Sequence, residues 1–196
     1  MFEIRIHGRG GQGGVTAAEM LSVAAFLEGR YAQAFPSFGS ERMGAPVVAY
    51  CRISDREIRL REPVLQPQAL IVQDPTLLHQ VDVFSGLGSD GYMLINTTRS
   101  FDELGIGDFV TGFRPERLAT VHATELALEH VGRPVPNAAL LGGFAAITGQ
   151  VSLDSVCAAI RERFGGKVAE GNARAATQAY EYVLRQAKEA AHAEAD

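Results

Sequence analysis

The sequence predicts an α/β fold in which a mixed, mainly parallel sheet is flanked by helices, with a helical C-terminal third. An alternating apolar and charged segment at the start of the chain runs into a glycine-rich turn, and a helical pattern follows. Two continuous apolar runs, 69–72 and 92–95, are typical of parallel strands that are covered on both faces. Beyond residue 136 the apolar residues recur at helical spacing.

Length and composition fit one folded domain. The chain has 196 residues, of which 46% are hydrophobic and 21% are charged, so it can bury a substantial core and is not of a disordered or fibrous type. We expect a single domain over 1–196. A formal net charge of -5 argues against a broad binding surface for nucleic acid or anionic lipid. We find no membrane span and no signal-peptide pattern, so we expect a cytoplasmic protein.

The first third of the chain predicts several strands and one helix. Residues 2–6 alternate as a strand that enters Gly8, and 15–26 have helical spacing with a stop signal at Gly29. Further strands are predicted at 31–35, 47–53 and 57–60, with Ser54, Asp55 and Arg56 joining the last two as a hairpin.

The rest of the chain predicts three more strands and then helices. The strands cover 69–72, 92–95 and, more weakly, 118–121. Thr124 is a candidate N-cap for a helix that reaches about residue 131. Three further helices are predicted at 136–148, 153–164 and 168–193, and Ser152 is a candidate cap for the second of them.

A glycine-rich turn matches the pattern G-x-G-x-x-G between the first strand and the first helix, as in Rossmann-like folds. Its backbone N–H groups and the helix N-terminus can bind an anion. The candidate binding residues are Gly8, Gly10, Gly11, Gln12 and Gly13. The acidic residue expected about 20 positions on is missing from 31–35, which argues against NAD or FAD. In the alternative interpretation, the glycines serve only a tight turn and close helix packing.

A second candidate site is the loop 38–46, where an acid and an arginine stand together among glycine and proline residues. Its candidate residues, which we expect at a partner or substrate passage, are Ser40, Glu41, Arg42 and Gly44. In the alternative interpretation, an internal contact between Glu41 and Arg42 merely shapes the loop.

Histidine and cysteine residues offer no convincing catalytic or metal site. His7 and His122 each lie at a predicted strand end, but a lone histidine there is typically a structural residue, and no Ser/His/Asp or Cys/His set can be assembled. Cys51 and Cys157 are far apart in sequence and form no CxxC motif, which argues against iron–sulfur and zinc sites. We therefore predict no catalytic residue and no metal ligand in this chain.

Four segments together resemble the gamma subunit of the 2-oxoacid:acceptor oxidoreductases, and the pyruvate/ketoisovalerate-type ferredoxin oxidoreductases most closely. They are IRIHGRGGQGGVTAAEML, GSERMGAPVVAYCRISDREIR, ALIVQDPTLL and GRPVPNAALLGGFAAITG. They cover nearly the whole chain in the right order. One departure matters: the family commonly has Glu-Arg-Arg-Gly where this chain has Glu41, Arg42, Met43 and Gly44, so any role that needs two adjacent guanidinium groups is in doubt.

The resemblance implies a complex in which this chain is a non-redox subunit with an architectural or gating role. The complex would convert a 2-oxo acid and coenzyme A to an acyl-CoA and CO₂, and pass electrons to ferredoxin or to an NAD-linked acceptor through other subunits. Thiamine diphosphate and Mg²⁺ would lie on alpha and beta partners, and iron–sulfur clusters on beta and delta partners. The alternatives are a free-standing nucleotide- or coenzyme A-binding module and a purely structural assembly subunit.

Overall fold

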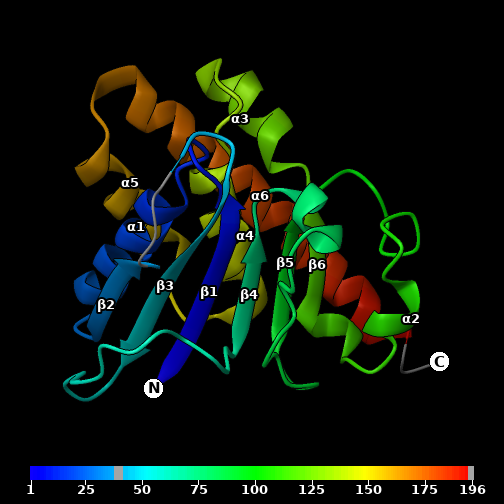
Figure 1. Ribbon diagram of the computed structural model, residues 1–196. Coiled ribbons are helices and arrows are strands. Elements are labelled where there is room, and N and C mark those ends of the chain that lie inside the picture. Colours follow the sequence, from blue (N-terminus) through cyan, green and yellow to red (C-terminus); the bar gives the residue numbers. More distant parts are fainter. Residues whose placement is uncertain (38–41, 194–196) are drawn as a thin grey trace.

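A six-stranded sheet forms the middle layer of the molecule (Figure 1). The structure is a computed structural model, and it describes residues 1–37 and 42–193. The strand order is β2-β3-β1-β4-β5-β6. The strands are β1 (Phe2–Arg9), β2 (Tyr31–Pro36), β3 (Pro46–Ser54), β4 (Ala69–Val72), β5 (Tyr92–Asn96) and β6 (Leu118–Val121). Because β1, β4, β5 and β6 are parallel and β3 is antiparallel to both of its neighbours, the prediction of a mixed, mainly parallel sheet is confirmed.

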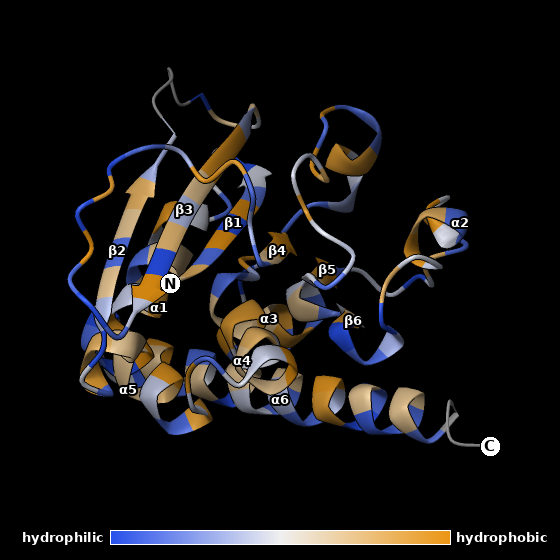
Figure 2. Ribbon diagram, turned by 90° about the horizontal axis from the view of Figure 1, so that it is seen from below, coloured by the Kyte–Doolittle hydropathy of each residue, from blue (hydrophilic) through white to orange (hydrophobic). Residues whose placement is uncertain are grey.

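The long helices cover one face of the sheet (Figure 2). They are α1 (Gly14–Leu27), α3 (Ala123–Val131), α4 (Asn137–Thr148), α5 (Leu153–Arg163) and α6 (Gly166–Ala193). Helix α4 is apolar on nearly every side and buried, as expected of a helix enclosed by others. Gly142 lets α6 approach closely, because a Cβ atom at this position would collide with the backbone carbonyl of Ala176. The helical C-terminal third predicted from the sequence is confirmed.

Short elements and loops cover β4, β5 and β6 on the opposite face. They comprise α2 (Gly107–Val110) and the 3₁₀ turn η1 (Pro75–His79), whereas a second 3₁₀ turn, η2 (Pro115–Arg117), precedes β6 and contacts α6. The sequence predicted none of these three short elements. A second apolar core lies beneath α2 and η1, and its partly buried rim includes Phe84 and Phe113. None of the described helices has the length and apolar character needed to span a membrane.

The predicted strand at 57–60, and with it the predicted hairpin, is wrong. Within 1–37 and 42–193 this segment has no strand partner, and β3 instead pairs with β2 and β1. Its backbone carbonyls are taken by side chains of the sheet: Leu60 accepts from Gln33 at 2.8 Å and Glu62 accepts from Arg52 at 2.6 Å. The segment is therefore bound across the sheet by side chains rather than by a backbone ladder.

The predicted N-cap at Thr124 is also wrong, whereas the one at Ser152 is confirmed. Helix α3 begins one residue earlier, and the Oδ1 atom of Asn96 accepts a hydrogen bond of 3.2 Å from the backbone N–H of Thr124. The amide of Asn96 also donates to the Thr124 hydroxyl at 2.8 Å. A residue at the end of β5 thus caps α3. In α5, the Ser152 hydroxyl accepts from the backbone N–H of Ser155, as expected.

The two edges of the sheet are covered differently. At the β6 edge, the side-chain amide of Gln186 donates to the Thr120 carbonyl at 2.9 Å, and its oxygen accepts from the Thr120 N–H at 3.3 Å. Helix α6 therefore satisfies edge backbone groups that would otherwise face outward. The β2 edge follows the exposed C-terminus of α1, and Tyr31 is about half exposed there.

Candidate functional site

The glycine turn joins β1 to α1 at the top of the sheet in Figure 1. Gly13 has φ 75°, a left-handed conformation that favours glycine, and occupies the N-cap position of α1. It has no side chain to cap the helix, so the first N–H groups of α1 lack the side-chain acceptor that a Ser or Asp cap would supply. The turn therefore has the backbone arrangement that can bind an anion.

The inner side of the turn is filled by protein. A Cβ atom at Gly8 would collide with the side-chain oxygen of Gln73, and one at Gly10 would collide with the backbone carbonyl of Arg42. Gln73 is buried, and its Oε1 atom has no hydrogen-bond partner among the described residues. A Cβ atom at Gly14 would lie 2.9 Å from that oxygen. At Gly8 and Gly10 the packing interpretation therefore accounts for the absence of a side chain.

A polar network beside the turn connects it to the end of β4. Asp74 Oδ2 accepts from Arg9 Nε at 3.1 Å and from Gln12 Nε2 at 2.9 Å. The Gln12 Oε1 atom accepts from the backbone N–H of Arg9 at 2.7 Å, while the Arg9 guanidinium also reaches Thr76 and Gln80. Gln12 therefore holds the turn in shape, and its side chain points into this network.

Asp74 is held as a carboxylate. Burial alone would raise its pKa, but hydrogen bonds from Thr76 and Gln12, together with the charge of Arg9, outweigh burial and lower the pKa. The ion pair with Arg9 is partly buried, with side-chain exposures of 20% for Arg9 and 15% for Asp74. Because both groups are already satisfied within the network, Arg9 is a structural residue of the turn rather than an available cation.

The outer side of the turn opens into a pocket of about 230 Å³. Gly11, Gly13 and Thr16 line the pocket, and Asn137 packs against Gly13, with its side-chain amide 3.4 Å from the Gly13 carbonyl oxygen. The remaining lining residues are Val131, Arg133, Val135, Arg163, Phe164, Val168 and Asn172. The pocket thus combines an uncapped helix N-terminus with two arginines, a combination suited to an anionic ligand.

The structure joins the two candidate sites that the sequence placed about 30 residues apart. The backbone N–H of Gly10 donates to Ala45 at 2.9 Å, and that of Gly44 donates to the Gly10 carbonyl at 3.1 Å. Arg42 and Gly44 are exposed, and the Met43 side chain lies over Gly11. Ser40 and Glu41 lie outside the described residues. The described end of the predicted loop therefore lies directly against the glycine turn.

The two candidate histidines are structural in the described chain. His7 is buried in β1, and its Nε2 atom accepts a hydrogen bond of 3.0 Å from Arg5. The ring of His122 packs edge-to-face on Tyr182 with centroids 4.8 Å apart. Both cysteines are buried and unbridged, and burial raises the pKa of Cys51 to about 12. Within the described residues, no three His, Cys, Asp or Glu side chains gather in a group that could hold a metal ion.

The sheet topology also explains the missing acidic residue. In the dinucleotide-binding arrangement, the strand after the first helix lies next to the first strand and presents an acid to the ribose. Here the antiparallel strand β3 lies between β1 and β2, so the end of β2 is not beside the glycine turn in that way. The turn resembles the dinucleotide-binding turn locally, while the surrounding sheet does not.

Comparison with known protein families settles the family. Residues 3–182 match the model of the family described as "Pyruvate ferredoxin/flavodoxin oxidoreductase". The chain belongs to this family. The resemblance read from its sequence motifs is thereby confirmed.

Members of the pyruvate ferredoxin/flavodoxin oxidoreductase family match this chain over nearly its full length. The pyruvate/ketoisovalerate oxidoreductases common subunit gamma of Pyrococcus abyssi is 49% identical over 181 residues, which are 92% of this chain and 96% of the relative. The pyruvate synthase subunit PorC of Methanothermobacter marburgensis is 50% identical, with 92% and 97% covered. The crystal structure of the PORC subunit of Thermotoga maritima pyruvate oxidoreductase superposes with a TM-score of 0.78 at 39% identity, and the match covers 92% of this chain and 95% of that one.

Three pocket residues of this family member were missed by the sequence analysis. Arg133 and Asn137 lie in the segment GRPVPN, which was noticed only as part of the resemblance. Arg133 lies in the loop that joins α3 to α4, and Asn137 is the first residue of α4. An arginine in a loop rich in glycine and proline was the available signal, since loops often carry binding residues. Arg163 comes from the end of α5, and nothing in the local sequence distinguishes it from other exposed arginines.

Proposed function

We propose that this chain is the gamma subunit of a 2-oxoacid oxidoreductase complex that converts a 2-oxo acid and coenzyme A to an acyl-CoA and CO₂. One relative that matches over nearly its full length is named the common subunit gamma of pyruvate/ketoisovalerate oxidoreductases, and another is named pyruvate synthase subunit PorC. These names support a pyruvate-like or branched-chain 2-oxo acid. Aromatic 2-oxo acids are a further candidate class. The electrons pass to ferredoxin or to another acceptor through other subunits.

The observation that carries a role in coenzyme A binding is the pocket beside the glycine turn. Its anion-binding elements are the N-terminus of α1, at Gly13, and the side chains of Arg133 and Arg163. Coenzyme A carries several phosphate groups, and helix N-termini and guanidinium groups are the usual partners of phosphate. We assign the phosphates to this pocket, which Gly11 and Gly13 line without a side chain.

In this proposal the loop 38–46 controls access to the pocket beside the glycine turn. Its backbone is hydrogen-bonded to Gly10, so any movement of the loop reaches the glycine turn directly. Met43 is 86% exposed and lies over Gly11 at the edge of the pocket, where a partner subunit or the ligand can cover it. Ser40, Glu41, Arg42 and Gly44 are therefore proposed as the passage between this chain and the catalytic partners.

The chemistry itself belongs to cofactors on partner subunits. Thiamine diphosphate and Mg²⁺ on partner subunits would supply the chemistry of decarboxylation, and iron–sulfur clusters would supply one-electron transfer. This chain supplies no catalytic residue in the proposal, and its role is architectural and gating. The isolated chain is accordingly expected to be inert, and it is expected to copurify with alpha, beta and delta-type subunits.

The test is a kinetic comparison in the reconstituted complex. Arg133→Gln and Arg163→Gln should each raise the KM for coenzyme A about tenfold or more, because a charge-assisted hydrogen bond is worth about 1.5–3 kcal/mol. The KM for the 2-oxo acid should stay unchanged. Arg185→Gln, an exposed position near the other end of α6, is the matched control.

Two results would contradict the proposal at different levels. If both pocket variants behave as the control, coenzyme A does not use this pocket. If the native chain is a monomer with its own turnover, or binds nucleotides without partners, the free-standing module is the correct alternative. Copurification and the colour of iron–sulfur clusters in the purified material distinguish these cases.

A further inference from the structure

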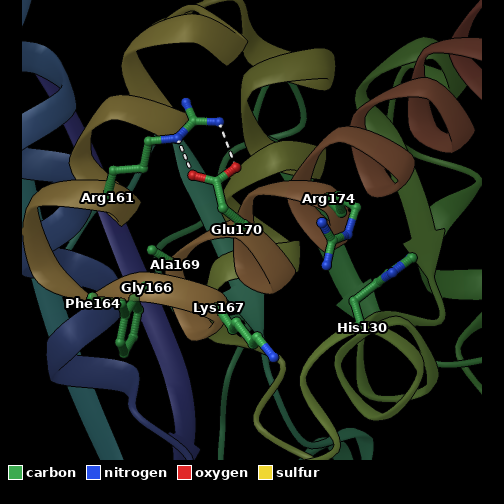
Figure 3. Close-up of a pocket in the computed structure, with 9 residues that line it drawn as sticks. His130, Arg161, Phe164, Gly166, Lys167, Ala169, Glu170 and Arg174 are labelled. Carbon is green, nitrogen blue, oxygen red and sulfur yellow. Dashed lines mark hydrogen bonds and ion pairs between the residues drawn. The ribbon is translucent and has the colours of Figure 1, made fainter.

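A second, larger groove lies on the helical layer, outside the site described above. It has a volume of about 870 Å³ and lies between the end of α3, the α5–α6 turn and the first two turns of α6 (Figure 3). Phe164 is the one described residue that it shares with the pocket beside the glycine turn. Helices α3 and α6 pack closely at one side of the groove. A Cβ atom at Gly171 of α6 would collide there with the backbone carbonyl of His130 in α3.

Three cationic side chains and one carboxylate are among the described residues that line this groove, and the carboxylate, Glu170, lies on α6 between Lys167 and Arg174. Arg161 and Glu170 form a two-pronged ion pair, with hydrogen bonds of 2.8 and 3.1 Å, which lowers the pKa of Glu170. The Arg161 charge is thereby matched within the chain. Lys167 and Arg174 lie on the part of α6 that faces His130 in Figure 3.

Because Glu170 balances only one of the three cations, the groove keeps an excess of positive charge in a chain whose formal net charge is -5. Lys167 and Arg174 are both exposed, and they are seven residues apart, so they share one face of α6. The N-terminus of a 28-residue helix adds partial positive charge at the same place. The groove therefore favours an anionic partner, and its volume leaves room for more than a simple ion.

The spacing of the two cations decides what kind of anion fits. Seven residues of helix separate Lys167 and Arg174 by about 10 Å along the helix axis, so a single phosphate group cannot contact both. A peptide segment that carries two carboxylates about 10 Å apart can contact both cations. The ring of Phe164 and the stems of the two cations offer apolar surface to the backbone of such a segment.

We propose that this groove binds an acidic segment of a partner subunit, which contributes carboxylates to Lys167 and Arg174. The proposal rests on the proposed function, since it requires that the chain assembles into a complex. It is independent of the coenzyme A pocket. The groove then acts as an electrostatic docking site, which guides association and fixes the position of the subunit more than it adds affinity.

Carbodiimide cross-linking of the reconstituted complex tests the proposal directly, because this reagent joins lysine amines to carboxylates that contact them. Lys167 and Lys188 are the only lysines in the chain, so the products can be assigned without ambiguity. Mass spectrometry should locate a bond from Lys167 to an Asp or Glu of a partner subunit. A complex in which Lys167 forms no such bond would overturn the proposal while leaving the proposed function intact.

Charge reversal provides a second, independent measurement. Lys167→Glu with Arg174→Glu should weaken association with the partner subunits about tenfold or more at low salt, and should reduce its dependence on salt. Arg185→Glu with Lys188→Glu changes the same net charge on the same helix and is the control. Association equal to the control would refute the docking site.

Loss of the Lys167 cross-link on addition of coenzyme A alone would assign the groove to a phosphorylated ligand instead. A chain that associates with no partner would overturn both this proposal and the proposed function.

Discussion

The Nε–H group of Arg5 donates a hydrogen bond of 3.0 Å to the Nε2 atom of His7, two residues further along β1. The bond requires a neutral imidazole, since a protonated ring has no acceptor nitrogen. The Arg5 guanidinium also donates to the carbonyls of Val83 and Ser85, at 2.8 and 2.6 Å. The pair therefore connects the sheet to the segment that covers it.

This pair makes the stability of the chain depend on pH. Burial, and next the charge of Arg5, lower the pKa of His7 from 6.5 to about 4. The unfolded chain thus binds a proton more readily between these values, so His7 contributes its full stability above pH 6.5 and loses it as the pH falls toward 4. The loss amounts to about 3 kcal/mol.

His7→Gln tests this dependence, because glutamine can accept the same hydrogen bond and does not titrate. Urea unfolding of the variant between pH 4.5 and 7 should show a pH dependence smaller by about 2 kcal/mol or more. His192→Gln, which removes an exposed histidine, should leave the dependence as it is. Equal pH dependence in the His7 variant and the native chain would refute this account of the pair.

The close contact between α4 and α6 predicts that alanine costs more stability at Gly142 than at its neighbour Gly143. Gly142→Ala brings a Cβ atom against the backbone of Ala176, which cannot move without separating the helices, so we expect a loss of about 1–3 kcal/mol. At Gly143 the new atom would meet methyl groups of Leu94 and Val183 at 3.1–3.4 Å, which can shift. Gly143→Ala should be better tolerated. Thermal or urea unfolding measures both, and equal losses would contradict the assignment of the contact to Gly142.

The glycine turn predicts a coupled effect on stability and ligand binding. Gly10→Ala displaces the Arg42 carbonyl and with it the hydrogen bonds that join the turn to Gly44 and Ala45. We expect a loss of about 1–3 kcal/mol in stability and a raised coenzyme A requirement in the complex. Gly88→Ala adds a Cβ atom in open space and is the control. Normal stability together with normal coenzyme A kinetics would mean that the two loops do not depend on each other.

We expect that lysine cannot replace Arg42 in the loop 38–46. Arg42→Lys removes a planar fork that can bind a carboxylate or phosphate through two hydrogen bonds, so coenzyme A dependence or subunit retention should change about 10- to 150-fold. Glu41→Gln should also impair one of these quantities. Arg185→Lys serves as the control. If both loop variants match it in turnover, coenzyme A dependence and subunit retention, the loop is a structural turn.

Most of the fold follows from patterns that are local in the sequence. The runs at 69–72 and 92–95 are continuous and apolar because both faces of β4 and β5 are covered, and this alone identifies them. The failure at 57–60 has a distant cause. This segment alternates like a strand, but Gln33 and Arg52 take the backbone carbonyls of Leu60 and Glu62. No local pattern reveals a side chain that arrives from another strand.

The candidate site likewise has one part that is local in the sequence and another part that is distant from it. The glycine turn is visible in the sequence because strand, glycines and helix are consecutive. Its partners are not, since Asn137 and Arg163 reach the pocket from helices that begin more than 100 residues later. The sequence also could not show which glycines line the pocket. Gly8 and Gly10 pack against other parts of the protein, whereas Gly11 and Gly13 line the pocket and also pack against side chains.

The Gln186 side chain on the backbone of Thr120 makes the two ends of the sheet unequal. A foreign strand can add at β2, whereas β6 is occupied by the chain's own helix. Two molecules that paired through β2 would each have used their one receptive edge, and their outer ends would both be β6. Misassembly through the edges of the described strands would therefore stop at a closed pair.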